Sequence, residues 1–195
     1  KPFAHFANLG SEEDAISCKI NTKKGWERIV RAAFEFARQH GRKKVTVVHK
    51  ANVVRATDGL FLEEAKKVAR DFPEIQMDDA NIDAICMWLL KNPFAYDVLV
   101  APNLYGDIIS DLCAQMVGGL GFGCSGNIGE RLAVFEPTHG SAPKYAGQYK
   151  VNPIATILTG LGIAMIYRID IAVDLQGWDA YSTKQLAWAA IAIVG

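Results

Sequence analysis

Short β-branched runs alternate with longer segments of helical periodicity through the first half of this sequence. Residues 44–49 (KVTVVH) are typical of a strand, and residues 96–101 (YDVLVA) are apolar enough to indicate a strand buried on both faces. Apolar side chains recur at helical spacing over residues 26–40, 59–71 and 81–91. Strands that alternate with helices of this length predict an α/β fold built in layers.

The second half of the sequence is richer in glycine and ends in an apolar segment. Glycines are frequent between residues 121 and 129, and a single strand is expected at residues 132–135. The uncharged run at residues 154–167 is too short to cross a bilayer and predicts a buried helix. Charged residues are sparse after residue 150, so we expect this end to join a core shared with further sequence or to form an oligomer interface.

Charge and cysteine usage exclude several classes of protein. The chain has 21 basic and 21 acidic residues, and this balance argues against a nucleic acid or an acidic membrane as a partner. Its four cysteines form no C-x-x-C pair, which favours reduced thiols packed as small apolar side chains over a disulfide framework or a zinc site. We therefore expect an intracellular, cytoplasmic protein.

The segment PNLYGDIISD at residues 102–111 combines a strand end with a helix start. Asp107 and Asp111 are four residues apart, so a helix places both carboxylates on one face. Paired carboxylates at the carboxyl end of a strand suit Mg²⁺ or Mn²⁺, which bind oxygen ligands. The alternative is that these acids only complement the dipole of the helix.

His49 and Lys50 close the predicted strand at residues 44–49. A lysine at this place can point into a cleft and bind a substrate carboxylate, or it can lie on the surface beside a turn. His49 is expected to be a structural hydrogen-bonding residue rather than a base. Asp83 lies inside a predicted helix and, on pattern alone, is an ordinary solvent-facing acid.

Two glycine-containing segments lead to opposite interpretations. Residues 121–126 (GFGCSG) match the spelling G-x-G-x-x-G, but a helix precedes them where the dinucleotide fingerprint requires a strand, so we reject that reading in favour of a connector. Residues 136–145 (EPTHGSAPKY) instead follow a strand and form a turn that a ligand can approach closely. Lys144 and Tyr145 could bind a phosphate there, although a polar surface turn remains the alternative.

Several motifs in one order carry a resemblance to a known family. HKANVVRATDGLF, NLYGDIISDL, GNIGE, FEPTHGSAPKYAGQYKVNP and ILTG resemble the metal-dependent decarboxylating dehydrogenases of isocitrate, 3-isopropylmalate, homoisocitrate and tartrate. Within that family, KYAGQYKVNP is most similar to NADP-dependent isocitrate dehydrogenase. The resemblance implies the layered isocitrate/isopropylmalate dehydrogenase fold rather than a Rossmann fold.

The resemblance also implies a role for individual residues. Asp107 and Asp111 would be ligands of Mg²⁺ or Mn²⁺, with Asp83 a third ligand that reaches over from the neighbouring subunit of a homodimer. Lys50 would cross the dimer interface toward the substrate and assist proton transfer. The predicted NADP-binding residues, which would contact adenine, ribose and the 2′-phosphate, are His139, Gly140, Ser141, Ala142, Pro143, Lys144, Tyr145 and Asn152.

The implied activity is oxidative decarboxylation of the small molecule isocitrate to 2-oxoglutarate and CO₂, with reduction of NADP. The alternatives are an NAD-dependent 3-isopropylmalate or homoisocitrate dehydrogenase, and a non-catalytic regulatory subunit of the same family. Residues 1–118 are expected to form a small domain with the dimer-forming and metal-binding elements. Residues 119–195 would form part of a large domain with the cofactor-binding loop. The family's tyrosine acid and substrate-binding arginines precede the matching segment, so we expect this chain to be a fragment.

Overall fold

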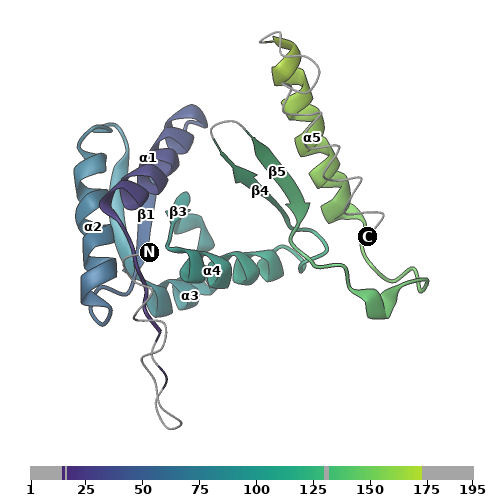
Figure 1. Cartoon of the computed structure of the whole chain (residues 1–195), viewed down its shortest axis with the longest axis horizontal. Coiled ribbons are helices and arrows are strands. Elements are labelled where there is room, and N and C mark those ends of the chain that lie inside the picture. Colours follow the sequence, from purple (N-terminus) through teal and green to yellow (C-terminus); the bar gives the residue numbers. More distant parts are fainter. Residues whose placement is uncertain (1–14, 16, 130–131, 173–195) are drawn as a thin grey trace. The chain divides into compact units, whose positions relative to one another are not determined.

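A computed structural model describes residues 15, 17–129 and 132–172 of the chain (Figure 1). The elements in order are α1 (Lys23–Gln39), β1 (Lys44–His49), α2 (Arg55–Ala69), β2 (Gln76–Asn81), α3 (Ile82–Lys91), η2 (Pro93–Ala95), β3 (Val98–Val100), α4 (Asn103–Met116), β4 (Cys124–Ile128), β5 (Ala133–Pro137), η3 (Pro143–Tyr145) and α5 (Ile154–Ala172). The chain divides into two compact units, Lys1–Ile109 and Ser110–Gly195, and their boundary falls inside α4. The domain limits expected from the sequence stay a prediction.

A three-stranded parallel sheet in the order β2-β1-β3 organises the first unit. The central strand, β1, is buried on both faces, since Val45 and Val47 on one face and Thr46 and Val48 on the other are at most 1% exposed. Its β-branched sequence suits this place, because such side chains pack well on a pleated surface. The layered α/β fold that the sequence predicts is confirmed, and its sheet is parallel.

Helices α1 and α2 pack together against one face of this sheet (Figure 1). Thr22 caps α1 by accepting a hydrogen bond from the Gly25 backbone N–H at 3.1 Å. The apolar stripe of α1 then meets α2, where the rings of Trp26 and Phe61 lie 4.7 Å apart between centroids. Helix α3 contacts β1 and β2 and buries Ile85 outside that core, so the sheet is covered by helices from more than one side.

The second unit consists of an antiparallel pair, β4 and β5, on which α5 packs. Phe135 of β5 is the centre of this packing. A Cβ built on Gly126 of β4 would lie 2.9 Å from its ring, and a Cβ built on Gly162 of α5 would lie 2.8 Å from it. The ring therefore fills space that two glycines leave open on either side.

The structure corrects the sequence prediction at two strands. Cys124–Ile128 forms β4, although the sequence predicts a connector there, because glycines and polar residues hide a strand whose side chains are all exposed. Tyr96 to Ala101 is not buried on both faces, since Asp97 is exposed and Val98 and Leu99 are only partly buried. The rejection of a Rossmann fingerprint at residues 121–126 is confirmed, because α4 precedes the segment and β4 begins within it.

Further expectations from the sequence concern membrane-spanning helices, the apolar segment near the C-terminal end and the cysteines. No helix among the described residues is long and apolar enough to cross a membrane. Helix α5 begins at Ile154, as the sequence predicts, but it is not the expected buried helix, since Ile157 and Leu161 are 57% and 55% exposed. The four cysteines, all within the described residues, form no disulfide, but Cys18 and Cys124 are exposed, so the expectation of packed thiols is wrong for these two.

Replacing Gly162 with alanine should destabilise the second unit, by about 1–3 kcal/mol, because the new methyl group would overlap the Phe135 ring. The matched control is Gly160→Ala in the same helix, where a Cβ meets nothing within 4 Å. That change should stabilise the protein by up to about 1 kcal/mol, as usual for glycine in a helix interior. Urea unfolding of both variants checks the pair, and equal shifts of the same sign would contradict the packing described for Phe135.

Candidate active site

Predicted catalytic and metal-binding residues follow the carboxyl ends of the three parallel strands. Lys50 directly follows β1, and Asp83 lies in the first turn of α3, which begins where β2 ends. Asp107 lies on α4, which starts three residues after β3. Parallel strands end at the same edge of a sheet, and His49 at the end of β1 pairs in register with Asn81 at the end of β2. Open α/β sheets place ligands at this edge.

Lys50 and Asp83 form an ion pair within one chain. The Lys50 ammonium lies 2.5 Å from Asp83 Oδ1, and the side chains are 23% and 66% exposed. The hydrogen bond from Lys50 lowers the pKa of Asp83 below its ordinary value. The structure thus brings together the two residues that the resemblance assigns jointly to the site of a neighbouring subunit.

Asp107 and Asp111 lie on α4, one helical turn apart and both exposed. Their carboxylate oxygens are the ligand type that Mg²⁺ and Mn²⁺ prefer, so this pair fits a divalent cation. Among the described residues, no three histidine, cysteine or acidic side chains come together as a complete metal site. Mg²⁺ also takes water ligands, and Asp83 of a neighbouring subunit stays the prediction for a third protein ligand.

The backbone turn that carries Lys50 is held by two side chains. The Lys50 N–H donates to Asp58 Oδ2 at 2.9 Å, and the next N–H, from Ala51, donates to His49 Nδ1 at 3.0 Å. Since His49 Nδ1 accepts, its Nε2 carries the proton and donates to Asp79 Oδ2 at 3.0 Å. The expectation that His49 is a structural hydrogen-bonding residue agrees with this geometry.

Asp58 is a fully buried carboxylate in the first turn of α2. Besides the Lys50 N–H, it accepts hydrogen bonds from the Lys19 ammonium at 2.8 Å, from the Thr57 hydroxyl at 3.2 Å and from the Tyr105 hydroxyl. Burial opposes the charged form of Asp58, but the bonds from Lys19, Lys50 and Tyr105 outweigh it, so its pKa lies below the ordinary value. Burial, together with Asp58, raises the pKa of Tyr105 to about 12.

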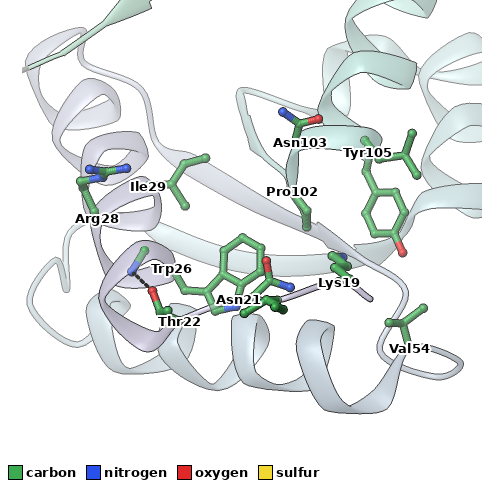
Figure 2. Close-up of a pocket in the computed structure, with 13 residues that line it drawn as sticks. Lys19, Asn21, Thr22, Trp26, Arg28, Ile29, Val54, Pro102, Asn103 and Tyr105 are labelled. Atoms are coloured by element: carbon green, nitrogen blue, oxygen red, sulfur yellow. Dashed lines mark hydrogen bonds between the residues drawn. The ribbon is translucent and has the colours of Figure 1, made fainter. Parts of the chain in front are cut away.

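Lys19 and Tyr105 border a pocket of about 780 Å³ in the first unit (Figure 2). The Lys19 ammonium lies 5.2 Å from the centroid of the Tyr105 ring, and the two side chains lie beside each other in the close-up. Trp26 and Pro102 contribute apolar surface to the same pocket. The Asp58 cluster therefore lies next to an open, largely apolar hollow rather than in a closed core.

The predicted NADP-binding segment surrounds a second pocket, of about 540 Å³, in the second unit. His139, Gly140, Ala142, Tyr145 and Asn152 line this pocket together with Val151 and residues 118–122. Ser141, Pro143 and Lys144 belong to the same segment but are not among the lining residues. The sequence prediction missed residues 118–122, although two of their glycines, Gly118 and Gly119, have left-handed φ angles of 118° and 102°.

Two side chains in this pocket are set to bind a ligand. His139 Nδ1 lies 2.9 Å from the Gly140 carbonyl, so it carries the proton and leaves Nε2 as an acceptor. Within the described part of the chain, His139 Nε2 is buried and has no hydrogen-bond partner. Asn152 Oδ1 accepts from the Ile154 N–H at 3.0 Å, which leaves its amide nitrogen as a donor. An aromatic base with both donors and acceptors, such as adenine, fits this pair.

The turn before Lys144 has a strained backbone. Ala142 has a φ of 46°, in the left-handed region that favours glycine. Such backbone strain often accompanies binding sites. The turn continues into η3, where the Lys144 ammonium lies 5.0 Å from the centroid of the Tyr145 ring. A positive charge and a hydroxyl are thus held together at the edge of the pocket.

Comparison with known proteins agrees with this arrangement. The sequence matches the isocitrate/isopropylmalate dehydrogenase family over residues 4–175. The chain belongs to this family. A 3-isopropylmalate dehydrogenase from Archaeoglobus fulgidus is 54% identical over 151 residues, which cover 77% of this chain and 46% of that protein. A probable mitochondrial NAD isocitrate dehydrogenase subunit alpha from Caenorhabditis elegans is 52% identical over 145 residues, covering 74% of this chain and 40% of that protein.

Among solved structures, isocitrate dehydrogenase from Methylococcus capsulatus matches this family member with a TM-score of 0.75 and 47% identity. That match covers 80% of this chain and 45% of the other. The chain therefore spans less than half the length of the relatives it matches.

Sequence patterns alone did not single out Asp58, Lys19 or Tyr105. Asp58 precedes the helix predicted from residue 59, whereas α2 begins at Arg55 and places Asp58 inside its first turn. An acidic residue in the first turn of a helix is an ordinary feature, so the pattern carries no signal of burial. A fully buried carboxylate with an ammonium partner 39 residues away is visible only in three dimensions.

Replacing Asp58 with asparagine should change how stability depends on pH. Because folding lowers the pKa of Asp58 from its ordinary 3.8, the unfolded chain takes up this proton first as the pH falls. The stabilisation from the carboxylate is therefore fully present above that value and is lost as the pH falls below it. Urea unfolding between about pH 6 and about pH 3 should show the difference between wild type and variant shrinking in acid, and a constant difference would contradict the assignment.

Proposed function

We propose that the complete protein catalyses the metal-dependent oxidative decarboxylation of isocitrate, with NADP as the hydride acceptor. The observation that carries this proposal is the ion pair of Lys50 with Asp83 at the carboxyl ends of two parallel strands, next to a third strand that is followed by Asp107, in a member of a dehydrogenase family. A non-catalytic subunit would have no need to retain a lysine and three acids suited to this chemistry. The same residues therefore favour an enzyme over a regulatory subunit.

Asp107 and Asp111 would hold the cation, and Asp83 of a second subunit would complete its protein ligands. When bound, Mg²⁺ or Mn²⁺ would supply Lewis acidity at the substrate hydroxyl and carboxylate, and the nicotinamide would accept the hydride. Their exposure leaves room for substrate oxygens and water.

Lys50 would act on protons at its Nζ atom. The ion pair with Asp83 holds the Lys50 side chain beside a predicted metal ligand. From there Lys50 can donate a proton to the carbanionic product that remains after CO₂ leaves, or relay a proton from the substrate hydroxyl. The turn held by His49 and Asp58 keeps its backbone fixed while the side chain reaches outward.

A homodimer is part of this proposal. Since Lys50 and Asp83 pair within one chain, both would enter the neighbouring site together. Helix α3, which carries Asp83, also exposes Met87, Trp88 and Leu90, by 57%, 41% and 64%. An exposed apolar surface of this kind on a site-bearing helix suits a subunit interface.

NAD-dependent oxidation of 3-isopropylmalate, or of a related acid, is the second candidate. The names of the two relatives described above favour it, since one is a 3-isopropylmalate dehydrogenase and the other an NAD-dependent isocitrate dehydrogenase. Lys144 and Tyr145 favour NADP, because an ammonium and a hydroxyl suit a 2′-phosphate, whereas NAD-selective sites use a carboxylate against the ribose hydroxyls.

Replacing Asp107 with asparagine in the complete enzyme should weaken Mn²⁺ binding and lower kcat by roughly a hundredfold or more, because a bound cation contributes several kcal/mol to the transition state. Calorimetric titration with Mn²⁺ gives a readout that does not depend on turnover. The matched control is Asp71→Asn, an exposed acid that pairs with Arg31 away from the strand ends. Unchanged Mn²⁺ affinity in the Asp107 variant would remove this residue from the site.

The double substitution Lys144→Asp/Tyr145→Ile should shift the kcat/KM ratio from NADP toward NAD. Each lost charge-assisted hydrogen bond contributes about 1.5–3 kcal/mol, or roughly ten- to a hundredfold in preference. Lys24→Asp is the control, because it makes the same charge reversal on an exposed residue of α1 in the first unit. A wild-type enzyme that already prefers NAD would instead support the second candidate.

A further inference from the structure

One buried carboxylate, that of Asp58, is hydrogen-bonded both to the turn that carries Lys50 and to the first turn of α4. Asp58 is 0% exposed, and its two oxygens accept from the Lys50 N–H, the Lys19 ammonium, the Thr57 hydroxyl and the Tyr105 hydroxyl. These donors come from the segment before α1, the turn after β1, α2 itself and the first turn of α4. A charged group without solvent contact costs free energy unless it is fully hydrogen-bonded, so this cluster has to be complete.

The hydrogen bonds around Lys50 show what Asp58 contributes locally. The Lys50 carbonyl accepts from the Val53 and Val54 N–H groups at 2.9 and 2.8 Å. On its amide side, the Lys50 N–H is held by Asp58 at 2.9 Å. With the backbone fixed on both sides, the Lys50 side chain leaves the turn in one direction and reaches Asp83.

We propose that Asp58 is the positioning residue of Lys50. This inference rests on the proposed function for its catalytic consequence, but not for its geometry. Asp58 fixes the backbone from which the Lys50 ammonium extends, and through Tyr105 it joins that backbone to the first turn of α4, two residues before Asp107. It touches neither substrate nor cofactor, and it acts through Lys50.

A carboxylate suits this place better than any neutral side chain. Both of its oxygens accept, so one group serves a backbone N–H, an ammonium and two hydroxyls at once. Asparagine has a single acceptor oxygen, so its NH₂ group would face either the Lys19 ammonium or the Lys50 N–H, and the four donors would compete for the oxygen that remains. The site therefore distinguishes an aspartate from its closest isostere.

The first test measures the position of Lys50 without using activity. A water-soluble carbodiimide joins an amine and a carboxylate in contact as an amide and takes up the oxygen lost from the carboxylate as a urea. In the full-length protein, Lys50 and Asp83 should cross-link, as quantified by peptide mass spectrometry. Asp58→Asn should lower that yield severalfold, whereas the matched control Glu64→Gln should leave it unchanged. Glu64 is also a buried acid of α2, but it pairs with Lys67 away from the site.

A second variant keeps the proposal testable if Asp58→Asn does not fold. Lys19→Met with Asp58→Leu removes the charged pair together, and buried pairs replaced by apolar residues of similar size often fold stably. This protein lacks an acceptor for the Lys50 N–H, so its cross-link yield should fall as well. A folded double variant with the wild-type yield would overturn the proposal.

Steady-state kinetics test the catalytic consequence. Misplacing a catalytic group by about 1 Å can cost about a hundredfold in rate, so Asp58→Asn should lower kcat by that order and change the substrate KM much less. Glu64→Gln should keep wild-type kinetics. Wild-type kcat in a folded Asp58→Asn enzyme would overturn the positioning role. A wild-type protein that oxidises no 2-hydroxy acid would refute the proposed function, while the cross-linking result would still decide the placement of Lys50.

Discussion

Parallel pairing of β1 with β2 on one side and β3 on the other is the constraint on which the first unit depends. Three strands that run in the same direction bring the residues after each of them to one edge of the sheet. The loops that follow can then differ in sequence while the reacting groups stay close. Burial of β1 on both faces makes this edge rigid, because any shift in register would move valine side chains out of two cores at once.

Much of this fold can be predicted from the sequence, because the spacing of apolar side chains differs between helices and strands. The run KVTVVH predicts β1 with the bounds that the structure has, since β-branched residues between a glycine-bounded helix and a polar turn allow few other structures. Helix α3 follows in the same way from Ile85 and Leu89 recurring on its buried face. Edge strands carry less information, and β4 escapes prediction because its polar side chains face solvent.

The residues of the candidate site also differ in how well the sequence predicts them. Asp107 and Asp111 can be recognised from their spacing, and the segment around His139 from its turn chemistry. Asp58 cannot, because its partners are Lys19, Lys50 and Tyr105, which lie far apart along the chain. Pairwise geometry of this kind depends on how α2 packs against β1 and on where α4 begins, and neither follows from a local pattern. The sequence therefore identifies groups that carry chemistry more readily than groups that hold them in place.

The packing around Phe135 also limits how the second unit can evolve. Its ring occupies the volume that side chains at positions 126 and 162 would need, and these positions lie on different elements. A relative with a larger residue at either position must first have acquired a smaller one at position 135. Replacement at position 135 should therefore precede replacement at either glycine, because steric overlap sets that order.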